Sequence, residues 1–297
     1  MCDHPGVSPA QTVEPNLRAR LAGVRALLLD LDGVLVLRGR LVPGAAEALA
    51  SLDHRDIPYA LATNTSLMSR VTLAGELDRV GVRVPPDLIV SAASAAAAYV
   101  RRRFGDAPLY VMAAPDARPE FEGLRLLSHD EAALPEARAA AVVVGDAADE
   151  FTRRNMQSAF TLLRGGARFV AMHKNRWWLT PAGEMLDAGA YVAGLEYVTR
   201  RRALVTGKPA RTFFAEGVRV LAELAGTAAL AAGEVAMVGD DLWNDVLGAQ
   251  KAGLKGVFVR SGKHGDAELA RVASGLGGRP PDAVAPSIVE IVAALPG

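Results

Sequence analysis

Residues 26–34 read Ala26-Leu27-Leu28-Leu29-Asp30-Leu31-Asp32-Gly33-Val34. A short apolar run that ends in acid and glycine is typical of a buried parallel strand with polar groups at its carboxyl end. Two later apolar runs end in the same way, at Thr63 and at Gly239-Asp240. Because ligands bind outside the carboxyl ends of the strands in an open α/β sheet, these polar residues are expected to meet in one crevice.

Short apolar runs alternate with amphipathic helical patterns from about residue 25 onward, which predicts an α/β fold with a doubly wound, Rossmann-like parallel sheet. The interval between Thr63 and Lys208 is much longer than one crossover and has its own alternation. We therefore expect a second α/β domain inserted into the first. The predicted limits are a flexible leader over 1–20, a core over 21–90 and 203–297 that resumes with a strand at 203–205, and an inserted domain over 91–202.

Composition excludes some partners and compartments. The chain has 297 residues, with 33 basic and 33 acidic side chains and one cysteine, Cys2. Because the charges cancel, we expect no binding to nucleic acid or to a membrane, and we interpret Arg101–Arg103 and Arg200–Arg202 as solvated helix ends. With no internal disulfide, no secretion signal and no apolar run near the ~18 residues of a membrane span, a cytoplasmic location is expected.

Asp30 and Asp32 have the chemistry of a phosphoryl-transfer pair. An aspartate at a strand end can attack phosphorus and become an acyl phosphate, which divides hydrolysis into two displacements. Asp32, two positions on, can protonate the leaving oxygen and then deprotonate the attacking water. Gly33 permits a tight turn there. A capped turn explains the motif equally well when it is taken alone.

An anionic nucleophile and an anionic phosphate repel each other unless cations lie between them. Mg²⁺ prefers oxygen ligands, so the carboxylates of Asp30 and Asp240 and the main-chain carbonyl of Asp32 are the predicted metal ligands. Asp241 and Asp245 are expected to orient metal-bound waters. Acidic residues that favour a helix N-terminus are the alternative explanation for this group.

Lys208, Thr63 and Asn64 complete the predicted site. Lys208 supplies a compact positive charge for phosphate oxygens and for the attacking carboxylate. Thr63 and Asn64 offer a hydroxyl and main-chain N–H groups at a strand-to-helix turn, where anions bind. Taken singly, a surface lysine and a simple N-cap are adequate alternatives. The ordered set is more specific than any of its members.

In these motifs and their order, the chain resembles the haloacid dehalogenase (HAD) superfamily, and the insertion between the second and third motifs resembles the NagD-like subfamily with a C2-type α/β cap. The similarity extends from about residue 26 to residue 262. Within the subfamily, the chain especially resembles the branch of phospholysine phosphohistidine inorganic pyrophosphate phosphatase and its HAD-like domain relatives. The stretches that carry this closer similarity are Val42-Pro43-Gly44-Ala45, Thr63-Asn64-Thr65, Gly207-Lys208-Pro209, Thr212-Phe213-Phe214 and Gly239-Asp240-Asp241.

The resemblance implies an Mg²⁺-dependent phosphatase that acts through an aspartyl-phosphate on small phosphorylated metabolites: phosphomonoesters, phosphoramidates or pyrophosphate. The aspartate at position 32 resembles the first motif of phosphatases and phosphomutases. Dehalogenases lack this acid, and transport ATPases have threonine there. Cap-mediated dimers occur in similar proteins, so a homodimer is compatible with the resemblance. The implied roles are Asp30 as nucleophile, Asp32 as acid/base and metal ligand, Thr63 and Asn64 as phosphate binders, Lys208 as charge clamp and Asp240 as metal ligand.

The segment 173–186 is our candidate for substrate selection, because caps of this type press a loop onto the core. His173, Lys174, Arg176 and Trp178 are its candidate contacts with the leaving group. A histidine after an apolar strand is more often structural, and neighbouring tryptophans more often cover a domain's own core.

Two functions of other classes compete with a phosphatase. One is a phospho-accepting module of the response-regulator type, in which the phosphorylated aspartate follows a separate acidic pair. The other is a catalytically weak HAD relative that acts as an interaction protein. The position of Asp30 ahead of the other acids, and the large insertion, favour the enzyme.

Overall fold

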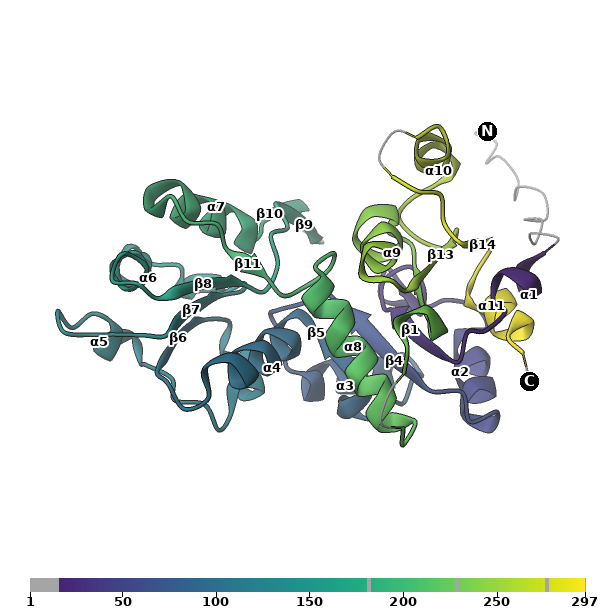
Figure 1. The fold of residues 1–297 in the computed structure, drawn as a ribbon, viewed down its shortest axis with the longest axis horizontal. Helices are drawn as coiled ribbons and strands as arrows, with labels where there is room; N and C mark the ends of the chain where they lie inside the picture. Colours follow the sequence, from purple (N-terminus) through teal and green to yellow (C-terminus); the bar gives the residue numbers. More distant parts are fainter. Residues whose placement is uncertain (1–15, 181–182, 228–229, 276–277, 297) are drawn as a thin grey trace, which may run out of the picture.

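A computed structural model describes residues 16–180, 183–227, 230–275 and 278–296, without the side chains of residues 178–180. Two sheets, each covered by helices, lie side by side along the long axis of the molecule (Figure 1). The sheet at the right of the figure contains the first strand of the chain, and the sheet at the left belongs to the inserted domain, which we call the cap.

The larger sheet has six parallel strands, as expected for the predicted α/β fold. The first strand lies near the centre, where Leu29 pairs with Val238 on one side and Asp30 pairs with Ala62 on the other. The order is β14 (Ala283–Ala285), β13 (Lys255–Val259), β12 (Val235–Gly239), β1 (Ala26–Asp30), β4 (Tyr59–Thr63) and β5 (Ile89–Ser91).

Helices cover both faces of this sheet, which confirms the doubly wound fold. Successive residues of β1 point to opposite faces, so Leu27 and Leu29 belong to one apolar cluster and Leu28 to another. The first cluster includes α1 (Leu17–Arg20), α2 (Ala45–His54), α3 (Arg70–Arg79) and α11 (Ile288–Ala294), and the second includes α8 (Arg211–Leu224) and α9 (Gly248–Ala252). The remaining helical segments are α10 (Asp266–Ala273), the 3₁₀ turns η1 (Pro86–Leu88) and η4 (Ala232–Glu234), and the π-helix η5 (Leu242–Leu247).

The cap is built around a four-stranded parallel sheet with the order β11 (Leu204–Val205), β8 (Arg168–Ala171), β7 (Ala141–Val144) and β6 (Leu109–Met112). One face packs against α4 (Ala92–Phe104) and the 3₁₀ segment η2 (Pro115–Phe121). The other face packs against α5 (His129–Ala132), α6 (Arg153–Arg164) and α7 (Ala188–Thr199), with η3 (Ala148–Glu150) nearby. Strands β6, β7 and β8 account for the alternation that the sequence shows within the insertion.

Two short hairpins complete the fold. The hairpin β2 (Val36–Leu37) to β3 (Arg40–Leu41) follows the Asp32 turn directly, and β9 (Trp177–Thr180) pairs with β10 (Gly183–Leu186) in the cap. The second hairpin occupies most of the predicted selection loop. It exposes Met185 and Leu186.

Two predicted limits are wrong in detail. Residues 17–20, assigned to the leader, form α1, and Leu17 is buried in the core because it packs beneath the larger sheet. Residues 204–205, assigned to the core, pair with β8 in the cap, and this pairing continues as Gly207 N–H donates to Met172 O at 2.6 Å. A short apolar run does not reveal which sheet edge it joins. The chain therefore leaves the cap sheet only one residue before Lys208.

None of the described helices is long and apolar enough to cross a membrane.

Candidate active site

A buried lysine and two buried aspartates form the centre of the site at the carboxyl end of β1. Lys208 Nζ lies 2.8 Å from Asp30 Oδ1 and 2.7 Å from Asp245 Oδ1, and it donates to Ala62 O at 3.0 Å. Burial alone would lower the pKa of Lys208, but the carboxylates of Asp245 and Asp30 raise it above its ordinary value. The lysine is therefore a permanent cation held against the predicted nucleophile.

Three carboxylates lie close enough to share one cation. Asp30, Asp240 and Asp245 are all buried, and one oxygen from each lies within 4.8 Å of the others. Asp245 Oδ1 is buried and faces Lys208, yet it accepts no hydrogen bond of good geometry among the described residues. Carboxylate oxygens are the ligands that Mg²⁺ and other hard cations prefer, so this donor set fits such an ion.

Burial and repulsion among these carboxylates raise the pKa values of Asp240 and Asp245. Burial and the charge of Asp30 raise the pKa of Asp240 to about 6, and the same two causes raise the pKa of Asp245 well above its ordinary value. A divalent cation would favour the ionised forms again. The sequence assigned Asp245 an outer role, whereas the structure places its carboxylate inside the cluster.

Gly33 allows the acidic cluster to approach the first turn. Its φ of +77° lies in the region that favours glycine. A Cβ atom on residue 33 would lie 2.1 Å from Asp240 Oδ2. The turn and the acidic cluster are therefore compatible only because residue 33 has no side chain.

Asp32 lies on the open side of the same turn. Its residue surface is exposed, in contrast to the burial of Asp30. Desolvation by the surrounding protein, and then the charge of Asp30, raise the pKa of Asp32. An accessible carboxyl group with a raised pKa suits a general acid.

Asp241 does not face the cluster. Its carboxylate caps η5, accepting from Trp243 N and Asn244 N at 3.0 Å each, and pairs with Lys263 Nζ at 3.0 Å. Burial would raise the pKa of Asp241, but the hydrogen bond from Asn244 and the charge of Lys263 lower it to about 2. The helix-capping alternative thus accounts for its side chain.

Lys263 is a site residue that the sequence analysis missed. Its main-chain N–H donates to Asp240 Oδ2 at 2.5 Å, so its loop fixes one ligand of the cluster. The loop follows β13, and the rule that strand ends meet at one edge would have found it.

Thr63 and Asn64 follow β4, as predicted, but they differ in what they offer. Thr63 is buried, and its hydroxyl accepts from Thr65 N at 3.2 Å. Both ends of the Asn64 amide bind the backbone of one residue: its Oδ1 accepts from Lys208 N at 2.7 Å and its Nδ2 donates to Lys208 O at 3.0 Å. The Asn64 side chain therefore holds the lysine loop.

Comparisons with known proteins agree with this geometry. The model of the family described as haloacid dehalogenase-like hydrolase matches residues 27–126, and the model described as HAD-hydrolase-like matches residues 205–291. The chain is 33% identical to haloacid dehalogenase-like hydrolase domain-containing protein 2 of Mus musculus over 249 residues, which cover 84% of this chain and 89% of the relative.

The chain belongs to the haloacid dehalogenase-like hydrolases. It is also 32% identical to human phospholysine phosphohistidine inorganic pyrophosphate phosphatase over 250 residues, which cover 82% of this chain and 86% of the relative. Membership of this family confirms the predicted NagD-like HAD hydrolase and argues against a response-regulator module.

Solved structures show the same fold in HAD enzymes. The 4-nitrophenylphosphatase of Thermotoga maritima is similar with a TM-score of 0.79 and 27% identity, covering 92% of this chain and 98% of that one. NagD from E. coli K-12 is similar with a TM-score of 0.76 and 26% identity. The similarity covers 90% of this chain and 98% of NagD.

Two of the cap residues predicted to contact the leaving group, His173 and Lys174, bind other residues of the protein instead. His173 is buried against Ser66, and Lys174 Nζ pairs with Glu196 of α7 at 2.6 Å. Arg176 is exposed at the start of the β9–β10 hairpin. The side chain of Trp178 lies outside the described residues.

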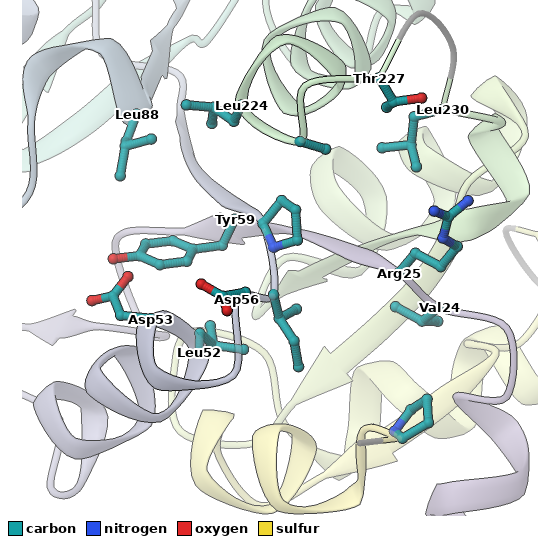
Figure 2. A pocket seen from close by; sticks show the side chains of 14 residues that line it. Val24, Arg25, Leu52, Asp53, Asp56, Tyr59, Leu88, Leu224, Thr227 and Leu230 are labelled. Carbon is teal, nitrogen blue, oxygen red and sulfur yellow. The ribbon is translucent and has the colours of Figure 1, made fainter.

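A pocket of about 660 Å³ lies at the opposite end of the larger sheet, next to the amino ends of β1 and β4 (Figure 2). Tyr59, Asp53 and Asp56 lie together on one side of it, and Leu224 lies across from them. Burial and the charge of Asp53 raise the pKa of Tyr59 to about 12. The pocket is lined by none of the residues of the acidic cluster.

Proposed function

We propose that this HAD hydrolase is an Mg²⁺-dependent phosphatase that hydrolyses small phosphorylated substrates through an aspartyl-phosphate on Asp30. The observation that carries the proposal is the contact of 2.8 Å between Lys208 Nζ and Asp30 Oδ1, next to Asp240 and Asp245. A carboxylate held this way is both a nucleophile and part of a cation site.

The residues supply each step of two successive displacements. Asp30 attacks phosphorus while Asp32 protonates the leaving oxygen, so that the ester bond breaks as the acyl-phosphate bond forms. Asp32 then takes a proton from water, which attacks phosphorus and frees Asp30. Throughout, Lys208 balances negative charge, and Thr63 with the main chain of Asn64 binds phosphate oxygens. When bound to Asp30, Asp240, Asp245 and the Asp32 carbonyl, a divalent cation would add further charge neutralisation.

The substrate class follows from charge and from the relatives. Phospholysine, phosphohistidine and pyrophosphate are named for the human relative, and 4-nitrophenyl phosphate for the Thermotoga enzyme. We propose compact phosphomonoesters as the substrates, with phosphoramidates and pyrophosphate as alternatives. The exposed side chain of Arg176 is the cap residue that we propose to contact an anionic leaving group. A small metabolite, a cap-mediated homodimer and a cytoplasmic location stay predictions.

Metal removal tests this function. We expect steady release of phosphate from 4-nitrophenyl phosphate with Mg²⁺, complete loss with EDTA, and recovery when Mg²⁺ is added in excess. Ca²⁺ serves as the matched control, because its larger, looser coordination should not restore turnover. Turnover that persists in EDTA would contradict the metal site, and no turnover with Mg²⁺ on any phosphate ester would favour the interaction-protein alternative.

The acid role of Asp32 makes a separate prediction. Asp32→Asn should lower kcat by about 10²- to 10⁴-fold, because the variant can neither donate nor accept the transferred proton. The loss should be larger for an alkyl phosphate than for 4-nitrophenyl phosphate, whose leaving group departs without protonation. Equal losses in kcat/KM, which reports the step in which the leaving group departs, would show that Asp32 does not protonate the leaving oxygen.

A further inference from the structure

Four polar residues that the proposed mechanism does not use are buried together between the cap and the core. We call them the junction cluster: Ser66, Asp146, His173 and Asp187, with exposed fractions of 1%, 9%, 3% and 5%. Ser66 follows β4 of the core, whereas the other three belong to the cap. Buried polar groups remain stable only when they are hydrogen-bonded, so their bonding pattern shows what the cluster does.

The hydrogen bonds assign the state of the imidazole. His173 Nδ1 accepts from Asn175 N at 3.4 Å, so Nε2 carries the proton and donates to Ser66 Oγ at 2.8 Å. Burial lowers the pKa of His173, against the charges of Asp187 and Asp146, which keeps the ring neutral. Ser66 Oγ also accepts from Asp146 N at 2.9 Å. One core hydroxyl therefore accepts two hydrogen bonds from the cap.

This pattern rules out a nucleophilic serine. In a Ser-His-Asp triad the acid and the hydroxyl bind opposite ring nitrogens. Here Asp187 Oδ1 lies 3.7 Å from Nε2, the same nitrogen that contacts Ser66. The cluster holds two domains together and does not activate a hydroxyl.

The junction cluster is adjacent, along the chain or through one backbone hydrogen bond, to the segments that carry the predicted phosphate ligands. Ser66 lies two residues after Asn64, whose amide exchanges two hydrogen bonds with the backbone of Lys208. Met172, directly before His173, accepts from Gly207 N at 2.6 Å, directly before Lys208. The two loops that carry the predicted phosphate ligands thus both meet the cap at His173.

We propose that His173 is a positioning residue: through Ser66 it fixes the turn of Thr63 and Asn64 and, with it, the Lys208 loop. The seating of the cap on the core thereby sets the geometry in which phosphate is bound. The inference rests on the proposed function for its kinetic consequence, but the contact itself is tested without turnover.

Substitution of His173 tests the proposal. His173→Leu should lower kcat for 4-nitrophenyl phosphate by about 10- to 100-fold, the usual effect of a small misplacement of catalytic groups, with a smaller change in KM. His173→Gln should restore most of the activity, because its terminal amide can place an N–H near Ser66 Oγ. Ser66→Ala removes the same contact from the core side and should not add to His173→Leu in the double variant.

A second cap histidine provides the control. His129 contacts Tyr110 at 2.9 Å and Glu150 at 3.1 Å, both within the cap. His129→Leu should leave kcat close to that of the wild type. A loss equal to that of His173→Leu would mean that general loosening of the cap explains both, and it would overturn the proposal.

Hydrogen exchange separates this inference from the proposed function. In His173→Leu and in Ser66→Ala, backbone amides of residues 63–69 and 206–208 should exchange faster than in the wild type, while those of β6 and β7 should not change. Unchanged exchange in the two loops would overturn the positioning role even if phosphate release falls. If the wild type releases no phosphate, the proposed function fails and the exchange experiment still decides this inference.

Discussion

Replacement of Asp30 by asparagine is expected to abolish phosphate release, by at least about 10⁴-fold in kcat. The amide has nearly the same shape but cannot attack phosphorus, so no acyl phosphate can form. Rapid quenching after mixing with a ³²P-labelled ester should show label bound to the wild-type protein and none bound to the variant. The measurement therefore reports the intermediate as well as the rate.

The fold should tolerate this change. Asp30 is one of three buried carboxylates that repel each other. When asparagine replaces Asp30, Asp245 still pairs with Lys208. We expect the thermal midpoint of Asp30→Asn, measured in EDTA, to be no lower than that of the wild type. Phosphate release near the wild-type rate by a folded variant would refute the assignment of the nucleophile.

Lys208→Met should damage both activity and stability. The variant has an unbranched apolar side chain one atom shorter and leaves Asp30 and Asp245 buried without their cation. Removing one partner of a buried pair costs about 3–5 kcal/mol in the free energy of unfolding. Loss of a charge that faces the phosphate should lower kcat by about 10²- to 10³-fold. Urea unfolding and phosphate release measure the two effects.

Lys263→Met is the matched control for this variant. Lys263 also pairs with an aspartate of the acidic motif, at 3.0 Å, but its side chain is 64% exposed, against 4% for Lys208. An exposed pair contributes less than about 1 kcal/mol. Its main-chain bond to Asp240 survives the substitution. Equal destabilisation by the two variants would show that burial of Lys208 has no special weight.

The sequence was sufficient for the fold and for the convergence of the central residues. Asp30, Thr63 and Asp240 each terminate or directly follow a strand of one parallel sheet, and the carboxyl ends of such strands meet at one edge. Local pattern and topology therefore determined where these residues lie. The catalytic roles assigned to them remain predictions that the variants above will test.

The remaining site features depend on packing that no local pattern encodes. Asp245 belongs to the cluster and lies in η5, a π-helix, in which the spacing of side chains differs from that of an α-helix. The side chain of Lys174 forms an ion pair with Glu196, 22 residues away in the sequence. His173 was a candidate substrate contact, but it is buried against Ser66, which lies 107 residues away in the sequence and in the other domain.

The short β11 strand limits how this protein can be re-engineered. Because its pairing with β8 continues to Gly207, an insertion or deletion in that segment would shift Lys208 along the mouth of the larger sheet. On the other side, β5 ends at Ser91 and α4 begins at Ala92, without a spacer. A chimera that exchanges inserted domains between homologues must therefore preserve the residue count of both crossings.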